Sequence, residues 1–456
     1  MANRIEQSMQ RRFNQPSGVE QFGLEAIPTE LKTTTWYDLF FIIVNFLINP
    51  ASLLIGGMAV VAGLSFWAAL TAELLGCVLA FAAYITIATV GVDYGLPGQV
   101  ATRITFGVLG AKWVPSPLRV IASVYWFAFQ TIAGSMVIAN ALDRLFGGHH
   151  SLLVISLIFG LAQTAVAILG FDYLKILSRF AFPLKVAILI YLGYVLMTCK
   201  NPHFARTAVI HYQGALGWHW PTIAVWVNSM AAGWICMVTD AADFCRYSRS
   251  RTDMWVGTMS AAIVGALFCG LLGAYGAAAT LGTNSNPFNV VIDARPERFI
   301  IFLVFVVIVL DNWTINVLNL YTGGLSLSNM FEELGRFWTT LIVAAVSILL
   351  SSVPVVVTRY LAFSTTIGNI FGPLAGVLIA DYVFVKRGRI ETWELFLVGG
   401  KYWYTKGFCI SAIVWSALGS VIYVLIPPWA IQTVVAMLFS GAGYFVTRRL
   451  MREPNL

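Results

Sequence analysis

Long apolar stretches separated by short polar connections fill nearly the whole chain. A helix needs about 20 apolar residues to cross a bilayer, and about twelve stretches in the chain meet that requirement. The predicted spans are residues 37–62, 66–90, 117–143, 151–171, 174–197, 221–245, 255–280, 299–328, 337–353, 360–384, 407–426 and 428–447. This pattern predicts an all-α integral membrane protein with a single transmembrane domain over residues 36–447.

Composition supports this class and excludes a soluble domain. Hydrophobic residues make up 59% of the 456 residues and charged residues 11%, whereas a soluble domain carries about 25% charged residues. Residues 1–35 are polar and of mixed charge, and 448–456 form a short basic tail. We expect both ends to be cytoplasmic and the first span to act as the insertion signal, with no cleaved leader.

The net charge of +7 reports membrane topology rather than a nucleic-acid partner. With both termini in the cytoplasm, 22 of the 28 Lys and Arg residues fall on the inner side and 6 on the outer side. This is the positive-inside asymmetry of membrane proteins. We therefore predict a multi-pass protein of the cell inner (plasma) membrane.

The chain carries no motif of an enzyme, a nucleotide-driven pump or a cofactor site. Phosphate-binding loops, nucleophile elbows and zinc-binding motifs are absent from the sequence, so transport would be gradient-driven or passive. The six cysteines show no spacing that predicts a disulfide, and the five histidines fall in two outer loops. We expect no enzymatic activity, no cofactor and no metal site beyond a transported cation.

Two predicted spans contain helix-breaking residues at matching places. Pro50 follows Asn49 in the first span, and Gly233 lies in the small-residue stretch 231–243 of the sixth. Interrupted helices five spans apart are typical of inverted-repeat transporters that bind their substrate near the midplane. The alternative is the ordinary tolerance of membrane helices for Gly and Pro.

Indole and carboxamide side chains also lie in the middle of spans. Trp126 and Gln130 are four residues apart and share a helix face, Trp234 lies in the sixth span, and Asn319 lies in the eighth. An indole offers a π-face, and a carboxamide offers one acceptor and two donors in a plane. These residues could bind a flat ring rich in donors and acceptors, or they could be helix contacts and interhelical hydrogen bonds.

The eighth span carries an unusually polar stretch over residues 311–321. Asp311 and Thr314 are one turn apart, which suits either an oxygen-ligated cation such as Na⁺ or a proton site. With Asn316 they are the candidate cation-binding residues; the alternative is a buried polar network. The segments 243–249 and 381–388 lie at cytoplasmic span ends, where we expect anchoring and an inner gate.

Several segments resemble one family over nearly the whole chain. They are residues 19–28, 95–97, 103–107, Trp126 with Gln130, 233–234, 243–247, 313–316, 319–321 and 370–377 with 381–382. In their order and spacing they resemble the nucleobase–cation symporter family, in particular its purine/cytosine permease branch.

The resemblance implies a LeuT-like fold of two inverted five-helix repeats plus two C-terminal helices, working by alternating access. The repeats would cover residues 36–198 and 221–385, and the extra helices 407–447. It also implies that Trp126 and Trp234 enclose the ring, while Gln130 and Asn319 bind its edge.

The family's cation site uses first-span carbonyls and eighth-span hydroxyls, here around Asn45 to Asn49 and Thr314. Both asparagines are also candidate lining residues. Trp313 and Ile315 depart from the polar residues of the family's cation site, and we hypothesise that Asp311 compensates as ligand or proton carrier.

We therefore predict a secondary transporter that imports a nucleobase, cytosine or a purine foremost, coupled to Na⁺ or H⁺. The alternatives are a transporter of the same fold for allantoin, a hydantoin or a thiamine-related pyrimidine, and a passive channel. We expect the protein to function as a monomer in the lipid bilayer. The sequence leaves the transported ring, the coupling ion, the stoichiometry and the oligomeric state open.

Overall fold

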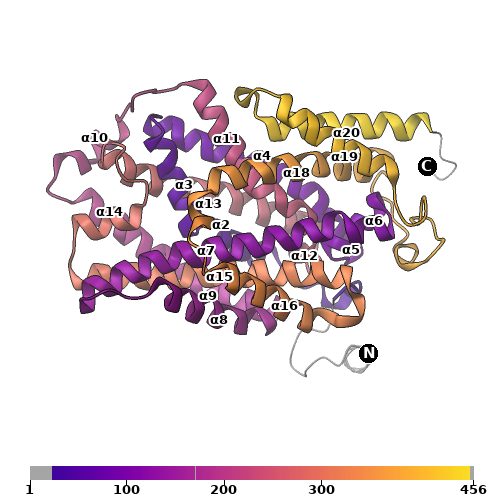
Figure 1. The fold of residues 1–456 in the computed structure, drawn as a ribbon, viewed down its shortest axis with the longest axis horizontal. Helices are drawn as coiled ribbons and strands as arrows, with labels where there is room; N and C mark the ends of the chain where they lie inside the picture. Colours follow the sequence, from indigo (N-terminus) through magenta and orange to yellow (C-terminus); the bar gives the residue numbers. More distant parts are fainter. Residues whose placement is uncertain (1–22, 170, 452–456) are drawn as a thin grey trace.

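The computed structural model describes residues 23–169 and 171–451, and within them regular structure is almost entirely helical (Figure 1). Only isolated β-bridges occur among these residues, and none belongs to a strand. Nine described helices are long and apolar enough to cross a membrane, or ten if the bent first pair counts as one span. The predicted all-α membrane class is confirmed, although fewer helices meet this criterion than the predicted number of spans.

Each predicted span coincides with a helix or an interrupted pair. The long helices are α4 (Phe66–Tyr94), α7 (Pro115–Phe146, with α6, Val108–Trp113, before it), α8 (Leu152–Leu169), α9 (Phe171–Met197), α11 (Trp220–Ile235), α13 (Arg251–Ala279), α15 (Arg298–Met330), α16 (Gly335–Leu350) and α18 (Tyr360–Ile379). The last two predicted spans correspond to α19 (Ile410–Leu425) and α20 (Gln432–Leu450), which lie outside the set of nine. The proposed repeat boundaries remain a prediction.

Shorter elements connect the long helices. The short α-helices are α5 (Gly98–Phe106), α10 (Arg206–Ile210), α12 (Ala241–Cys245), α14 (Pro287–Ala294) and α17 (Val355–Thr358). The 3₁₀ and π turns are η1 (Thr29–Leu31), η2 (Pro202–Phe204), η3 (Cys236–Thr239), η4 (Glu332–Leu334), η5 (Ala380–Val385), η6 (Thr392–Phe396) and η7 (Pro428–Ala430).

The first span is broken where the sequence predicts it. Helix α2 (Trp36–Leu47) and helix α3 (Pro50–Val61) meet at an angle of 56°. Pro50 has no N–H to donate and disfavours helix at the preceding residue. Asn49 caps the new helix, because its Oδ1 accepts hydrogen bonds from the backbone N–H groups of Ala51 and Ser52, each at 3.0 Å.

The sixth span is interrupted as well. Helix α11 passes into the 3₁₀ turn η3, and the chain then resumes as the short helix α12. Gly233 and the polar residues that follow lie at this transition. Both predicted interruptions are therefore present in the structure.

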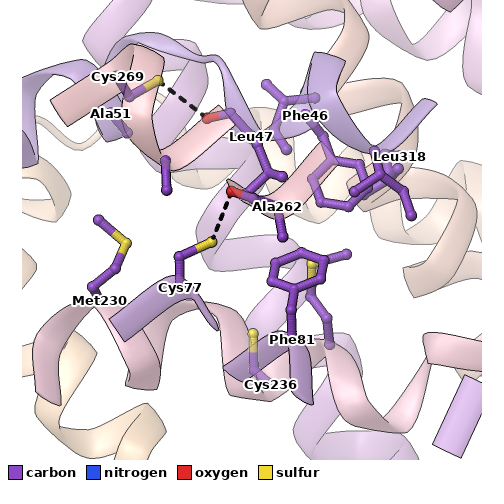
Figure 2. Packing of buried hydrophobic residues seen from close by; sticks show 14 of the residues in the cluster. Phe46, Leu47, Ala51, Cys77, Phe81, Met230, Cys236, Ala262, Cys269 and Leu318 are labelled. Atoms are coloured by element: carbon purple, nitrogen blue, oxygen red, sulfur yellow. Dashed lines mark hydrogen bonds between the residues drawn. The ribbon is translucent and has the colours of Figure 1, made fainter. Parts of the chain in front are cut away.

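Buried aromatic and small side chains fill the space behind the first break. Phe46 of α2 lies beside Phe81 of α4 (Figure 2). Their ring centroids are 6.4 Å apart, and the ring planes differ by 21°. The thiols of Cys77 and Cys269 donate to the carbonyls of Ala262 and Leu47 at 3.6 and 3.5 Å. These contacts hold α2, α4 and α13 together around the end of α2.

Helices α7 and α15 run side by side and carry candidate site residues toward each other. Their close approach depends on Gly134, because a Cβ there would lie 2.2 Å from Nδ2 of the fully buried Asn312. No side chain larger than hydrogen fits at this crossing without displacing Asn312.

We predict that Gly134→Ala lowers the free energy of unfolding by about 1–3 kcal/mol, because overpacking forces α7 and α15 apart. Thermal melting in detergent measures the loss. Gly233→Ala is the matched control, since a Cβ there would have its nearest neighbour at 3.9 Å. The double variant Gly134→Ala/Asn312→Ala should recover part of the loss, and a melting midpoint for Gly134→Ala equal to that of the control would contradict the prediction.

Candidate functional site

A cavity lies between the two interrupted spans and the α7–α15 pair. Its wall includes residues of α3, α7, α11, η3, α15 and α18. Trp126, Gln130, Trp234 and Asn319 all line it, together with Asn49 at the first break. The structure thus brings together the four residues that the sequence singled out on three separate spans.

The two indoles are held by other aromatic rings. Trp126 makes an edge-to-face contact with Phe129, with centroids 5.8 Å apart, and lies 6.3 Å from Tyr360. Trp234 packs against Phe46 at 5.8 Å, and its Nε1 donates to the sulfur of Met230 at 3.1 Å. Both indoles are only half-buried, so part of each π-surface is available to a bound ring.

Gln130 has a polar atom that no protein group uses. Its Nε2 donates to Asn49 Oδ1 at 3.1 Å, while its Oε1 is buried and accepts no hydrogen bond from any residue the structure describes. A buried acceptor without a partner is costly. A ligand N–H reaching Gln130 Oε1 would relieve that cost.

Asn319 is oriented through a chain of amides. Its Nδ2 donates to Asn316 Oδ1 at 3.2 Å, and Asn316 Nδ2 donates to Gln163 Oε1 at 2.7 Å and to Thr131 Oγ1 at 3.0 Å. Asn319 therefore presents its carbonyl oxygen as the end that can receive a substrate donor. Asn316 bonds to residues of α7 and α8, whereas Asp311 pairs with Lys185 of α9.

The two first-span asparagines have different surroundings. Asn49 lines the cavity and joins the helix break to Gln130. The side chain of Asn45 points toward α9, where its Nδ2 donates to the carbonyl of Ser178 at 2.7 Å, and it is not among the lining residues of the cavity.

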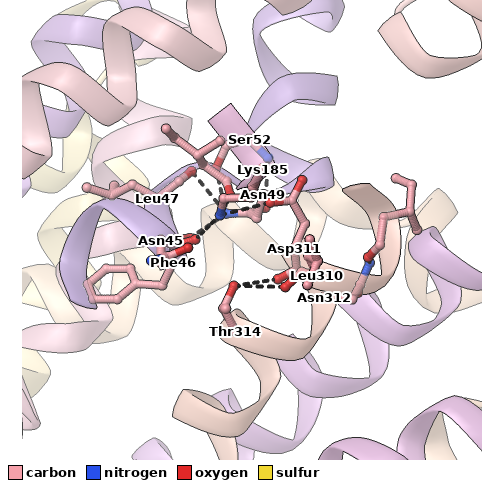
Figure 3. A network of polar contacts seen from close by, with 12 residues as sticks. Asn45, Phe46, Leu47, Asn49, Ser52, Lys185, Leu310, Asp311, Asn312 and Thr314 are labelled. Carbon is pink, nitrogen blue, oxygen red and sulfur yellow. Dashed lines mark hydrogen bonds and ion pairs between the residues drawn. The ribbon is translucent and has the colours of Figure 1, made fainter. Parts of the chain in front are cut away.

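Asp311 is paired with a lysine that sequence reasoning missed. Lys185 Nζ lies 2.8 Å from Asp311 Oδ1, and both side chains are fully buried (Figure 3). Lys185 lies in the middle of α9, inside the predicted span 174–197. The available signal was a lysine far from either end of an apolar span, which is rare and usually functional. Thr314 bonds within its own helix, its Oγ1 donating to the carbonyl of Asp311 at 2.9 Å.

A second buried ion pair lies at the wall of the cavity, and sequence reasoning missed it too. Arg119 lines the cavity, and its guanidinium lies 2.9 Å from Asp240 Oδ2 and donates to Thr322 Oγ1 at 3.1 Å. Asp240 therefore balances the charge that Arg119 brings to the cavity wall. In the neighbouring segment 243–249, Asp243 accepts a hydrogen bond from the backbone N–H of Gly98 at 2.6 Å, which ties α12 to α5.

Comparison with known proteins relates the chain to one family of permeases. Residues 26–447 match the sequence profile of a family described as permeases for cytosine/purines, uracil, thiamine and allantoin. The chain is 27% identical over 362 residues to a hydantoin permease of Microbacterium maritypicum, covering 75% of this chain and 71% of that protein. It is 24% identical over 447 residues to an allantoin permease of Bacillus subtilis, covering 89% and 88%.

A similar fold occurs among solved structures. One is Mhp1, a nucleobase-cation-symport-1 family transporter, in a closed conformation with bromovinylhydantoin bound. It superimposes on this chain with a TM-score of 0.81. That alignment has 21% sequence identity and covers 95% of this chain and 97% of Mhp1. The likeness confirms the predicted transporter fold.

We predict that Asp240→Asn lowers the free energy of unfolding by about 3–5 kcal/mol, because it leaves the buried Arg119 charge without a counter-ion. The double variant Arg119→Gln/Asp240→Asn should lose less, since no unpaired charge remains. Asp293→Asn breaks the solvent-exposed pair with Arg144 and serves as the control, with an expected loss of about 0–1 kcal/mol. Chemical or thermal unfolding of the three variants checks the order.

Proposed function

The chain belongs to the family of permeases for cytosine/purines, uracil, thiamine and allantoin, and we propose that its cavity binds a neutral, planar, nucleobase-like ring. It is a membrane transporter and not an enzyme. We further propose that Trp126 and Trp234 enclose the ring while Gln130 and Asn319 bind its edge.

The observation that carries this proposal is the unused acceptor on Gln130. Gln130 Oε1 lies in a largely apolar cavity beside two half-buried indoles. A ring with an N–H group in its plane satisfies this acceptor while its faces remain against the indoles. Cytosine, purines, uracil, hydantoins and allantoin all carry such N–H groups. The unused acceptor therefore supports binding of this class of ring and does not select one compound within it.

Transport through this fold requires the cavity to open to each side in turn, and we propose that a cation gradient drives the cycle. The interrupted helices that border the cavity are where such transporters bind substrate and coupling ion. We also propose an inner-membrane location and cytoplasmic termini, which the short connections and the positive-inside charge distribution support. We further propose that the protein functions as a monomer.

The main alternative within this function is a hydantoin or allantoin as the physiological substrate rather than a nucleobase. The names of the relatives favour these compounds as candidates, since a hydantoin permease and an allantoin permease are among them. Both rings are neutral and present in-plane N–H groups, so the same four residues would bind them.

We expect Gln130→Ala and Asn319→Ala each to weaken binding of the transported ring about tenfold, since each removes a hydrogen bond formed in a buried site. Uptake of radiolabelled cytosine, adenine and allantoin by cells expressing each variant measures the effect. Gln432→Ala is the matched control, because its amide bonds the carbonyls of Tyr423 and Ile426 away from the cavity. Uptake by both site variants equal to that of the control would exclude the assigned cavity.

A thermal-shift screen identifies the ring. Cytosine, adenine, uracil, allantoin, 5-benzylhydantoin and thiamine are each added to the purified protein, and we expect at least one of the neutral rings to raise the melting midpoint. The rise should disappear in Trp126→Ala and Trp234→Ala, which remove the stacking surfaces. A shift with thiamine alone, a cation, would contradict the preference for a neutral ring.

A further inference from the structure

The amino group of Lys185 lies at the break of the first span. Its Nζ is 2.8 Å from Asp311 Oδ1 and donates to the backbone oxygens of Asn45 at 2.9 Å and Ile48 at 2.8 Å (Figure 3). An ammonium group has three N–H donors, and here oxygen partners on two different helices receive them. Lys185 therefore joins the end of α2 to the middle of α15.

The break itself creates the need for a positive charge. Helix α2 ends at Leu47, and its last carbonyls lose their helical partners because the chain turns by 56° before α3. These oxygens are the negative end of the α2 dipole, and no water of the bilayer can satisfy them. A cation at this point is stabilised by the dipole, the carbonyls and Asp311 together.

These are the groups that the sequence marked for a coupling cation. The predicted site comprised the backbone around Asn45 to Asn49 together with Asp311 and Thr314. In the structure the chain's own ammonium lies among them, bound to Asn45, Ile48 and Asp311. A sodium ion sharing these oxygens would lie beside a buried like charge, and the repulsion at such a separation is strong in a low-dielectric interior.

We propose that Lys185 is the cation site of this permease and that its coupling ion is a proton, an inference that rests on the proposed transport function. A proton from water on the outer side binds the neutral amine and forms the ammonium that joins α2 to α15. Release of that proton to water on the inner side returns the amine, which loses its charge and one N–H donor, so the ion pair with Asp311 ends and the junction of α2 with α15 weakens. Each cycle forms and then breaks one N–H bond at Nζ, moves one proton and one positive charge, and changes no other covalent bond of the chain.

Other ionisable groups surround Lys185 on the neighbouring helices. Asp311 of α15 is its direct partner, Cys269 of α13 donates to Leu47 O at 3.5 Å, and Glu73 of α4 approaches Gly56 and Gly270. Nearer the start of α9, Lys175 and Arg179 pair with Asp38 of α2. On α14, Asp293 pairs with Arg144 of α7. Helix α8 carries no ionisable side chain. Asp311, which the sequence suggested as a proton carrier, and Glu73 are the competing carriers. Glu73 competes because it is buried and its Oε2 has no hydrogen-bond partner among the described residues.

The first experiment measures sodium binding with no ring compound present. Purified protein is melted in NaCl and in choline chloride at equal ionic strength, and binding of radioactive ²²Na⁺ is measured in parallel. We expect the wild-type midpoint to be the same in both salts and no saturable ²²Na⁺ binding. A sodium-specific rise in the wild-type midpoint, or saturable ²²Na⁺ binding, overturns the proposal.

The second experiment empties the site. Lys185→Ala leaves the carboxylate of Asp311 and the carbonyls of Asn45 and Ile48 as oxygen ligands without a cation, a donor set that suits Na⁺. We expect NaCl to raise the melting midpoint of this variant by about 5 °C over choline chloride, and Lys175→Ala on the same helix to show no difference. A Lys185→Ala protein indifferent to Na⁺ overturns the proposal, and if it cannot be purified the wild-type measurements still decide.

The third experiment follows protons. Liposomes with the protein and a trapped pH dye are given cytosine, allantoin or 5-benzylhydantoin, and wild type should acidify the lumen as the compound enters. Lys185→Ala should lose this acidification but keep the thermal shift with the compound, and Lys185→Arg, which stays protonated, should lose it too. Glu73→Gln should keep it.

Together, the three experiments distinguish a failure of the Lys185 proposal from a failure of the proposed transport function. Loss of acidification in Glu73→Gln with retention in Lys185→Ala overturns the assignment of Lys185. The sodium measurements contain no ring compound, so they decide the cation site even where none of the compounds is carried and the proposed function fails.

Discussion

The break between α2 and α3 places unpaired backbone groups inside a bilayer, and much of the structure serves to satisfy them. Asn49 accepts the first N–H groups of α3, and Lys185 donates to the last carbonyls of α2. Water cannot supply these partners at that depth, so each must come from a side chain. The break can therefore exist only where Asn49, Lys185 and Asp311 come together in the folded protein.

The same residues connect the break to the cavity. Asn49 caps α3 and also accepts a hydrogen bond from Gln130, which lies on the cavity side of α7. Any rotation of α2 and α3 that disturbs the cap changes the partner of Gln130. Lys185 contacts the end of α2, the break carries Asn49, and Asn49 contacts Gln130. A change at the Lys185 ammonium can therefore reach Gln130, the residue that we propose binds the ring, through the end of α2 and the side chain of Asn49.

Packing of α7 on α15 sets the geometry of recognition. Gly134 permits the close approach, and the amide chain from Gln163 through Asn316 fixes the orientation of Asn319. Arg119 carries a charge into the same space, but Asp240 neutralises it. The outcome is an apolar cavity with a few oriented amides, which is suited to a neutral ring and unsuited to an ion.

The sequence by itself determined the membrane class, the order of the spans and both interruptions, and it marked Trp126, Gln130, Trp234 and Asn319 as costly side chains inside apolar spans. The family resemblance grouped these four residues at one site, and the structure places them in one cavity. Hydropathy, helix breakers and costly polar groups in apolar spans are local signals, so they can be recognised without the fold. Only the tertiary structure decided what the polar groups face. Asp311 resembles a cation ligand in isolation, but the residue that satisfies it, Lys185, is 126 positions away. Partners so distant in the chain are chosen by helix packing, which leaves no local trace in the pattern of residues.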